Sequence, residues 1–313
     1  MSRLTRPHQW GTGLRRRAGA GRDAMGFGVP AFAHPLVAPT EWAELARPGA
    51  PLHWAAFDVA RGPGTRPDPL YGEVVGRVRE NGVPVLGLLD CRNGTRPFGD
   101  LLADASHYLD WYRVDGFYLD RAPTGRADAA ECRRVVTTLR ALLHADDEDT
   151  EDTGGTGGTE GAEGNEDAAD SRGRWGSGAS GASGASGRAG AAASRLPESG
   201  GGQIVLGHGE HPWPGYAELA DQLVTFCGPW TSYRWSEAPE WTAAYPPERF
   251  VHLVHGLPRS HLDTALRIAR WQGASTVCLT DRTDRDGADP WAGLAGYWHE
   301  AVRMLRKQPS PST

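Results

Sequence analysis

The apolar residues of this chain fall into eight short runs, separated by longer stretches in which they recur at spacings of three and four. Short apolar runs bounded by Gly, Pro and polar residues are typical of strands buried on both faces of a parallel sheet. Spacings of three and four predict helices that pack one face on such a sheet. The expected strands are 27–33, 52–57, 83–89, 116–119, 203–206, 222–226, 250–254 and 275–279. The expected helices are 70–80, 98–112, 127–143, 262–271 and 291–305, with two shorter ones after Pro39-Thr40 and after Pro214.

Eight strand–helix units over about 250 residues predict an α/β fold, a single (β/α)₈ TIM-type barrel. A doubly wound parallel sheet is the alternative. It is less favoured because no Gly-rich phosphate-binding fingerprint follows the first strand.

Three segments have a composition that cannot bury a core. They are an Arg-rich extension (1–24), an insertion rich in acids, Gly, Ser and Ala (146–201), and a short tail (308–313). We expect all three to be disordered. The two halves of the barrel are then 25–145 and 202–307. The insertion joins the fourth helix to the fifth strand, on the face opposite a barrel's active site, so it should not act as a lid.

The net charge of −6 arises largely in the insertion, which holds twelve acids and four arginines. The folded part is therefore only weakly acidic, which argues against a nucleic-acid groove. No apolar run is long enough to cross a membrane, and no secretory signal is seen. Four widely spaced cysteines without a CxxC pair read as reduced thiols. These features predict a cytoplasmic protein with no membrane or nucleic-acid partner.

Candidate chemistry gathers just after each strand, beginning with Asp120 at the end of the run Phe117-Tyr118-Leu119. In a barrel these positions meet on one rim, where such enzymes keep their active site. Alternatively, Asp120 caps the helix that follows. The other rim candidates are His34, Asp58, Asp90, His208, Glu210, Cys227, Trp230, Tyr233, His255 and Asp281.

Acids, histidines and aromatic rings on one rim suit a saccharide site, since sugar rings stack on aromatic faces and carboxylates bind hydroxyls. Two carboxylates can also cleave a glycosidic bond. We predict Asp120, Asp90 and Glu210 as catalytic, with Asp281 as another possible partner acid. The predicted saccharide-binding residues are His34, Asp58, His208, Trp230, Tyr233, His255 and Asp281.

Other chemistries have weaker support. The histidines and acids lack HExxH or HxH spacing, so no metal site or other cofactor is predicted. No GxSxG elbow supports a Ser/His/Asp triad. Cys227 with His255 as its base stays open as a nucleophile.

Several motifs follow one another in a specific order: VPAFAHP (29–35), GPG (62–64), Tyr71, VLGLLD (85–90), YLDWYRVDGFYLD (108–120), GPWTSY (228–233), Trp241 with PPERF (246–250), LTD (279–281) and DPW (289–291). Together they resemble the spherulation-specific family 4, or spherulin-4-like, proteins over about residues 26–305. The resemblance implies a glycoside-hydrolase-like (β/α)₈ barrel that acts on amino-sugar polysaccharides such as galactosaminogalactan.

The chain departs from that family at the expected catalytic positions. The resemblance implies an Asp-Glu pair after the fourth strand, where this chain has Asp120 and Arg121, and a Phe-Glu-Gly run after the sixth, where it has Cys227. Strand alternation predicts that Arg121 points away from the barrel axis. Two hypotheses therefore remain: a glycosidase that uses Asp120 with a replacement acid, and a catalytically inactive barrel that binds a saccharide or a protein.

Overall fold

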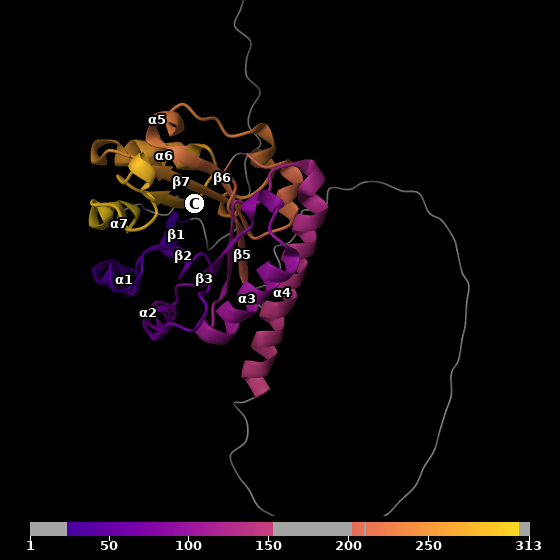
Figure 1. The fold of residues 1–313 in the computed structure, drawn as a ribbon. Coiled ribbons are helices and arrows are strands. Elements are labelled where there is room, and N and C mark those ends of the chain that lie inside the picture. Colours follow the sequence, from indigo (N-terminus) through magenta and orange to yellow (C-terminus); the bar gives the residue numbers. More distant parts are fainter. Residues whose placement is uncertain (1–23, 153–201, 210, 307–313) are drawn as a thin grey trace, which may run out of the picture.

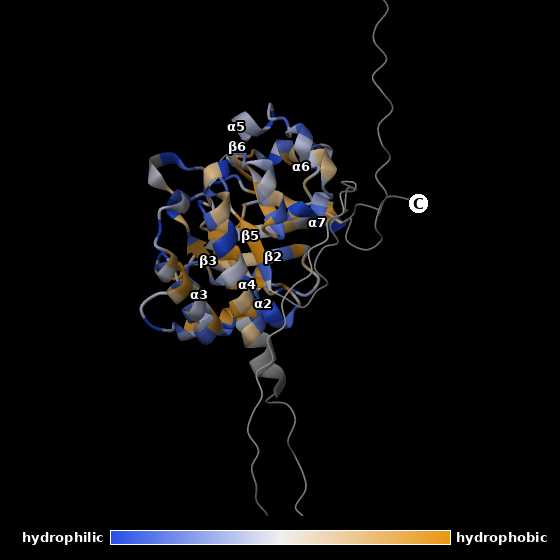
Figure 2. Ribbon diagram, turned by 90° about the vertical axis from the view of Figure 1, so that its right-hand side faces the viewer, coloured by the Kyte–Doolittle hydropathy of each residue, from blue (hydrophilic) through white to orange (hydrophobic). Residues whose placement is uncertain are grey.

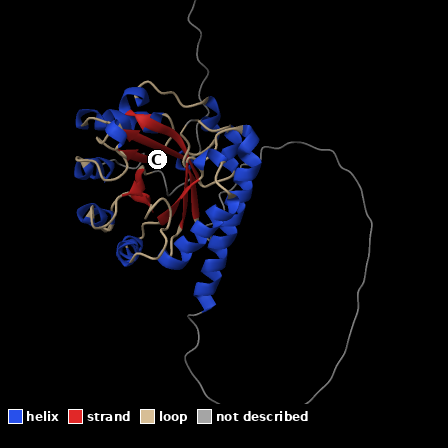
Figure 3. Ribbon diagram, viewed as in Figure 1, coloured by secondary structure: helices blue, strands red, loops and turns tan. Residues whose placement is uncertain are grey.

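The computed structural model describes residues 24–152, 202–209 and 211–306 of the chain. Eight parallel strands pair in chain order and close into a barrel, because β8 pairs with β1. Helices surround the strands (Figures 1 and 3). The predicted (β/α)₈ barrel is confirmed, and the doubly wound sheet was the wrong alternative.

The strands lie within a few residues of their predicted positions, and β6 extends three residues further than expected. They are β1 (Gly26–Phe32), β2 (Leu52–Phe57), β3 (Val85–Asp90), β4 (Gly116–Asp120), β5 (Gln203–Leu206), β6 (Gln222–Pro229), β7 (Phe250–His255) and β8 (Thr276–Leu279). A register shift between Val224 and Phe226 in β6 brings Cys227 opposite Leu253 of β7.

The helices are α1 (Pro39–Leu45), α2 (Pro69–Glu80), α3 (Phe98–Tyr112), α4 (Ala129–Asp152), α5 (Trp230–Tyr233), α6 (Leu262–Trp271) and α7 (Trp298–Arg306). Short 3₁₀ helices occupy Arg92–Gly94, Arg126–Asp128, Pro214–Glu218, Glu240–Ala244, Pro247–Arg249, Arg259–His261 and Arg285–Gly287. The helix expected after Pro214 is thus a 3₁₀ turn. The backbone of α4 continues to Asp152, past the predicted start of the insertion at residue 146; residues 153–201 lie outside the described part.

The starts of two helices, α2 and α7, bear on the site. Asp68 caps α2, because its side chain accepts a hydrogen bond from the backbone of Leu70, and Pro69 begins the helix. The predicted helix 291–305 begins seven residues late, at Trp298. Pro290 and the glycines Gly293 and Gly296 favour a loop there, so Trp291 belongs to the loop after β8.

Alternate side chains of the strands fill two apolar layers. Trp54, Leu86, Tyr118, Val205 and Leu253 are among the residues that pack inside the barrel. The other face of each strand packs against the helices (Figure 2, where the strands are largely orange and the helices mix blue and orange segments). This alternation decides which residues at the ends of the strands point into the barrel mouth.

A polar network lies inside the barrel. The Trp54 indole donates to Oε1 of Gln222 at 2.7 Å, and Gln222 donates to Thr276 at 2.9 Å and to the Glu248 carbonyl at 2.8 Å. Each buried polar group of Gln222 is therefore satisfied.

Among the described helices, none has the length and apolar character that a bilayer crossing requires.

Candidate active site at the carboxyl ends of the strands

Asp90 and Asp120 end neighbouring strands and are register partners across the β3–β4 pair. Leu88 and Tyr118, two residues earlier in these strands, pack inside the barrel. Side chains two residues apart point to the same face of a strand, so Asp90 and Asp120 also point inward. Asp120 is the last residue of β4, and α4 begins only at Ala129, so the alternative in which Asp120 caps the next helix is wrong. The sequence-predicted acids Asp90 and Asp120 are thus brought together at the barrel mouth.

Arg121 lies against both carboxylates. Its guanidinium donates two hydrogen bonds to Asp90, with Nε at 2.9 Å from Oδ1. The same Nε lies 3.9 Å from Oδ2 of Asp120. Because this nitrogen lies 2.9 Å from Oδ1 of Asp90 and 3.9 Å from Oδ2 of Asp120, these two oxygens are no more than 6.8 Å apart. That is below the upper limit of the about 5–10 Å that separates paired glycosidase carboxylates.

The prediction that Arg121 points away from the axis was wrong. Arg121 has a φ of 48°, in the left-handed region. This conformation ends the alternation of β4, so the side chain folds back over the rim to Asp90. A non-glycine residue in this region costs free energy, which the two charge-assisted hydrogen bonds offset.

The two carboxyl groups experience opposite environments. Burial raises the pKa of Asp120 to about 6, with a further increase from the charge of Asp90 and a decrease from the backbone hydrogen bond at Arg121. Burial also acts to raise the pKa of Asp90, but the hydrogen bonds from Arg121 and from the Arg92 backbone outweigh it and lower this pKa below its usual range. Asp120 keeps 40% of its side chain exposed, because the mouth opens to solvent. At mildly acidic pH, one acid of the pair is therefore protonated and the other is ionised.

Cys227, Cys278 and His255 line the mouth from β6, β8 and β7. Cys227 and Cys278 pair in register with the same residue, Leu253 of β7, from opposite sides. Cys227 is exposed at its surface, but the protein atoms around it partly desolvate the thiol and, with the charge of Asp120, raise its pKa to about 11, so it is not an activated nucleophile. His255 is 7% exposed, and its Nδ1 has no hydrogen-bond partner among the described residues. Its nearest acid, Asp284, is 4.0 Å away.

The loop after β8 adds two residues that sequence reasoning did not assign to the site, Asp289 and Trp291. The Trp291 ring packs on the interior cluster and meets the His255 ring edge-on, with centroids 5.9 Å apart. Asp289 accepts a hydrogen bond from the Trp291 backbone at 2.9 Å, and its charge adds to the raised pKa of Asp120. Their DPW motif is a signal in the sequence, but the apolar spacing after it predicts that Trp291 begins a helix.

Three other predicted residues hold the rim loops. Oδ1 of Asp58 accepts a hydrogen bond from the Gly62 backbone at 2.5 Å. Nε2 of His34 lies 3.1 Å from the helix-capping Asp68. Asp281 accepts from the Gly296 backbone at 3.1 Å, in the loop that leads to α7. Burial raises the pKa of Asp58, and Asp90 and Asp104 add to that increase. These contacts give the three residues structural partners beside the mouth.

The remaining predicted residues lie away from the mouth or outside the described part. Tyr233 is fully buried, and its hydroxyl lies 2.8 Å from Nδ1 of His252 in the layer behind β6 and β7. Trp230 is 6% exposed and stacks on His261, with centroids 5.3 Å apart. His208 is 2% exposed and packs edge-on against Tyr216. We therefore leave these three out of the proposed site; Glu210 lies outside the described residues.

Two surface pockets lie elsewhere. One of about 200 Å³ lies between α1 and α7 and another of about 170 Å³ between α1 and α2, both on the outer helices. We place the candidate active site by its chemistry, because the acids with displaced pKa values lie at the mouth. No group of three or more His, Cys, Asp or Glu side chains within the described ranges is arranged to hold a metal ion.

Comparisons with known proteins agree with this architecture. The crystal structure of Aspergillus clavatus Sph3 in complex with GalNAc is similar, with a TM-score of 0.60 and 18% sequence identity over 90% of this chain and 97% of that one. At this identity the similarity concerns the fold. No curated protein matches the chain. The family model for spherulation-specific family 4 matches residues 27–305, so this chain belongs to spherulation-specific family 4.

Proposed function

We propose that this barrel binds an amino-sugar saccharide at its mouth and hydrolyses a glycosidic bond there. In this proposal Asp120 is the proton donor and Asp90 is its ionised partner. The supporting observation is the Asp90–Asp120 pair, whose pKa values are displaced in opposite directions within reach of one arginine. Titratable pairs whose environments displace their pKa values in opposite directions mark acid and base roles in enzymes.

Each acid has a role that follows from its charge. Asp120, with a pKa of about 6, keeps its proton at mildly acidic pH and can transfer it to the oxygen of the departing sugar. Asp90 is ionised at the same pH and can activate water or stabilise positive charge that develops on the sugar ring. Arg121 keeps Asp90 in that state.

The opposite side of the mouth offers groups that recognise a sugar. The Trp291 ring supplies an apolar surface for the face of a pyranose. His255 Nδ1, buried and without a partner among the described residues, can exchange a hydrogen bond with a hydroxyl or an acetamido group. The saccharide class takes further support from the relative Sph3, whose crystal structure is a complex with GalNAc.

The test is hydrolysis at pH 5 of galactosamine oligosaccharides that are either fully or partly N-acetylated. The reducing ends released are measured over time. Asp120→Asn and Asp90→Asn should each lower the rate by about 10²–10⁴-fold, the usual contribution of acid–base help. Asp281→Asn is the matched control, because this rim acid accepts a hydrogen bond from the Gly296 backbone. Equal rates in all three variants would contradict the assignment.

A second function has its own supporting observation. The Arg121 guanidinium donates hydrogen bonds to both carboxylate oxygens of Asp90. Cys227 stands where the family resemblance implies a glutamate, so that position supplies no carboxylate. A barrel of this kind can bind a saccharide without cleaving it. Calorimetric binding of the same oligosaccharides with no reducing ends released, from a well-folded protein between pH 4 and 7, would establish binding and reject hydrolysis.

A further inference from the structure

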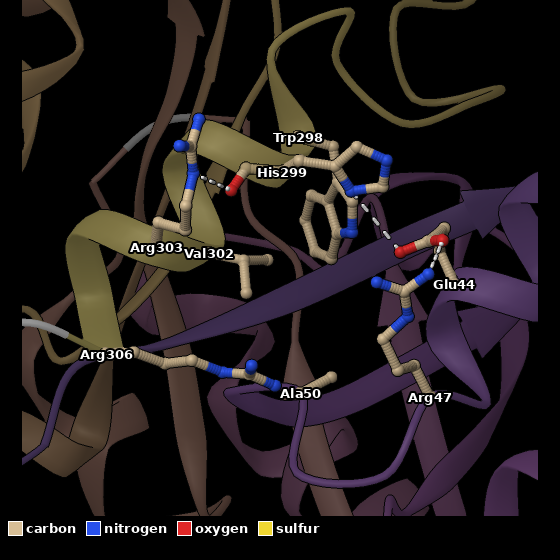
Figure 4. A pocket seen from close by; sticks show the side chains of 8 residues that line it. All are labelled: Glu44, Arg47, Ala50, Trp298, His299, Val302, Arg303 and Arg306. Atoms are coloured by element: carbon tan, nitrogen blue, oxygen red, sulfur yellow. Dashed lines mark hydrogen bonds and ion pairs between the residues drawn. The ribbon is translucent and has the colours of Figure 1, made fainter.

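The pocket between α1 and α7 lies on the far side of the molecule from the barrel mouth. It has a volume of about 200 Å³ and is formed by the carboxyl end of α1, the length of α7 and the loop that leads into β2. Ala50 of its lining lies just before β2, and Trp298 packs on Phe27 near the start of β1, so the pocket is at the amino ends of the strands, opposite Asp90 and Asp120. Figure 4 shows its lining.

One wall of the pocket is apolar. Trp298 and Val302 project from α7, and Ala50 faces them from the loop before β2 (Figure 4). Trp298 is 7% exposed and is held by the ring of Phe27 in β1, with centroids 4.7 Å apart. The wall is therefore rigid and can pack against the carbon skeleton of a small ligand.

The rest of the lining is cationic. Its single carboxylate, Glu44, lies 2.6 Å from Nη2 of Arg47 and 3.4 Å from Nδ1 of His299. Arg306 donates to the Gly49 carbonyl at 2.6 Å, and Arg303 donates to the His299 carbonyl at 3.4 Å. Within the described ranges neither of these two arginines forms an ion pair with a carboxylate. The lining thus holds three arginines and one carboxylate, so its formal charge is positive.

We propose that this pocket binds a phosphate or sulfate group, either free or as the ester of a small molecule. Guanidinium groups recognise such oxyanions through paired, charge-assisted hydrogen bonds. The excess of positive charge and the small volume suit one tetrahedral anion, and the Trp298 wall accommodates the group that carries it. The proposal does not depend on the function of the barrel mouth.

The experiment is isothermal titration calorimetry of the full chain with sodium phosphate, sodium sulfate and glucose 1-phosphate, in low salt at pH 7. Sodium chloride at matched ionic strength controls for general screening. Arg306→Gln should weaken phosphate binding by about 10-fold or more, since a hydrogen bond to a charged group is lost. Glu44→Gln should tighten it several-fold, because the opposing charge is removed. Arg267→Gln removes one exposed α6 charge away from the pocket and should leave binding unchanged.

The titrations with phosphate and with glucose 1-phosphate also distinguish a free anion from a phosphate ester. Glucose 1-phosphate binding more tightly than inorganic phosphate indicates an ester whose sugar packs on Trp298, and equal affinities indicate the free anion. If Arg306→Gln does not fold, as judged by circular dichroism, Arg303→Gln replaces it. The proposal would be overturned if sodium chloride gave the same binding heat as sodium phosphate. It would also be overturned if neither Arg306→Gln nor Arg303→Gln weakened phosphate binding. Hydrolysis at the mouth can fail without affecting this result, since only anion binding is measured.

Discussion

The guanidinium of Arg121 binds the carboxylate of Asp90, although Arg121 directly follows Asp120 in the chain. The left-handed backbone at Arg121 makes this cross-strand contact possible. A basic residue at the position where the family resemblance implies a glutamate thus leaves Asp120 with a raised pKa and keeps its neighbour ionised.

Asp120→Asn should alter stability in a pH-dependent way. The pKa of Asp120 rises from 3.8 to about 6 on folding, so the native state binds this proton more tightly than the unfolded state. The stability that the proton contributes is complete below about pH 4 and is lost as the pH rises through about 6. The melting temperature of the variant, relative to that of the native protein, should therefore be higher at pH 7.5 than at pH 4.5. Calorimetric melting at both values checks this, and an equal difference at both would refute the raised pKa.

Arg121→Gln should shift the acidic limb of the pH–activity profile upward by about one unit. The reason is that the arginine lowers the pKa of Asp90, and its removal lets burial raise that pKa. The profile of kcat/KM against pH is the measurement. Arg113→Gln is the matched control, since Arg113 is also exposed, has a φ of 53° and ends α3 at the opposite face. A limb that stays in place in Arg121→Gln contradicts the proposed role.

Trp291→Ala should weaken saccharide binding by about 5–10-fold, as expected when a stacking surface worth about 1 kcal/mol is lost. Tyr233→Phe offers the contrast. It removes the hydroxyl that pairs with His252 in a fully buried place, so it should cost about 1–3 kcal/mol of stability. Its saccharide affinity should stay native. Titration calorimetry and chemical denaturation separate the two, and a loss of affinity in Tyr233→Phe would return this tyrosine to the site.

Thiol modification should report on the mouth through Cys227. This is the exposed cysteine, and its raised pKa of about 11 should make its reaction with methyl methanethiosulfonate slow at pH 7 and faster at pH 9. The modified thiol should block saccharide binding, and bound saccharide should slow the modification. Cys227→Ser should be insensitive to the reagent. If the modified protein binds saccharide normally, the ligand does not reach this side of the mouth.

The barrel was predictable because its strands are short apolar runs whose ends carry turn residues. Helices 98–112 and 262–271 were predicted at their observed bounds. The errors occurred where tertiary contacts decide. Trp291 has helical spacing with residues after it, yet its ring packs inside the barrel and the helix starts at Trp298.

The site was only partly predictable. Strand ends predicted that Asp90, Asp120 and His255 lie at the barrel mouth, because alternation carries the inward phase to the last residue of each strand. Alternation failed for Arg121, whose left-handed φ reverses its direction, and it cannot say that Tyr233 turns outward to His252. Phe226 and Cys227 depend on a register shift in β6, which no apolar pattern encodes. Local backbone geometry thus determined the residues that sequence reasoning misplaced.

The closure of the barrel has a consequence for how the chain folds. β1 and β8 pair through only two register positions, Gly26 with Thr276 and Phe27 with Val277, which join segments from the two ends of the chain. Contacts so distant in sequence carry a large loop-closure entropy and form slowly. This seam should therefore be the last joint to form during folding and the first to exchange its amide protons in the native protein. A ligand between α1 and α7 would bridge the same seam and slow its opening.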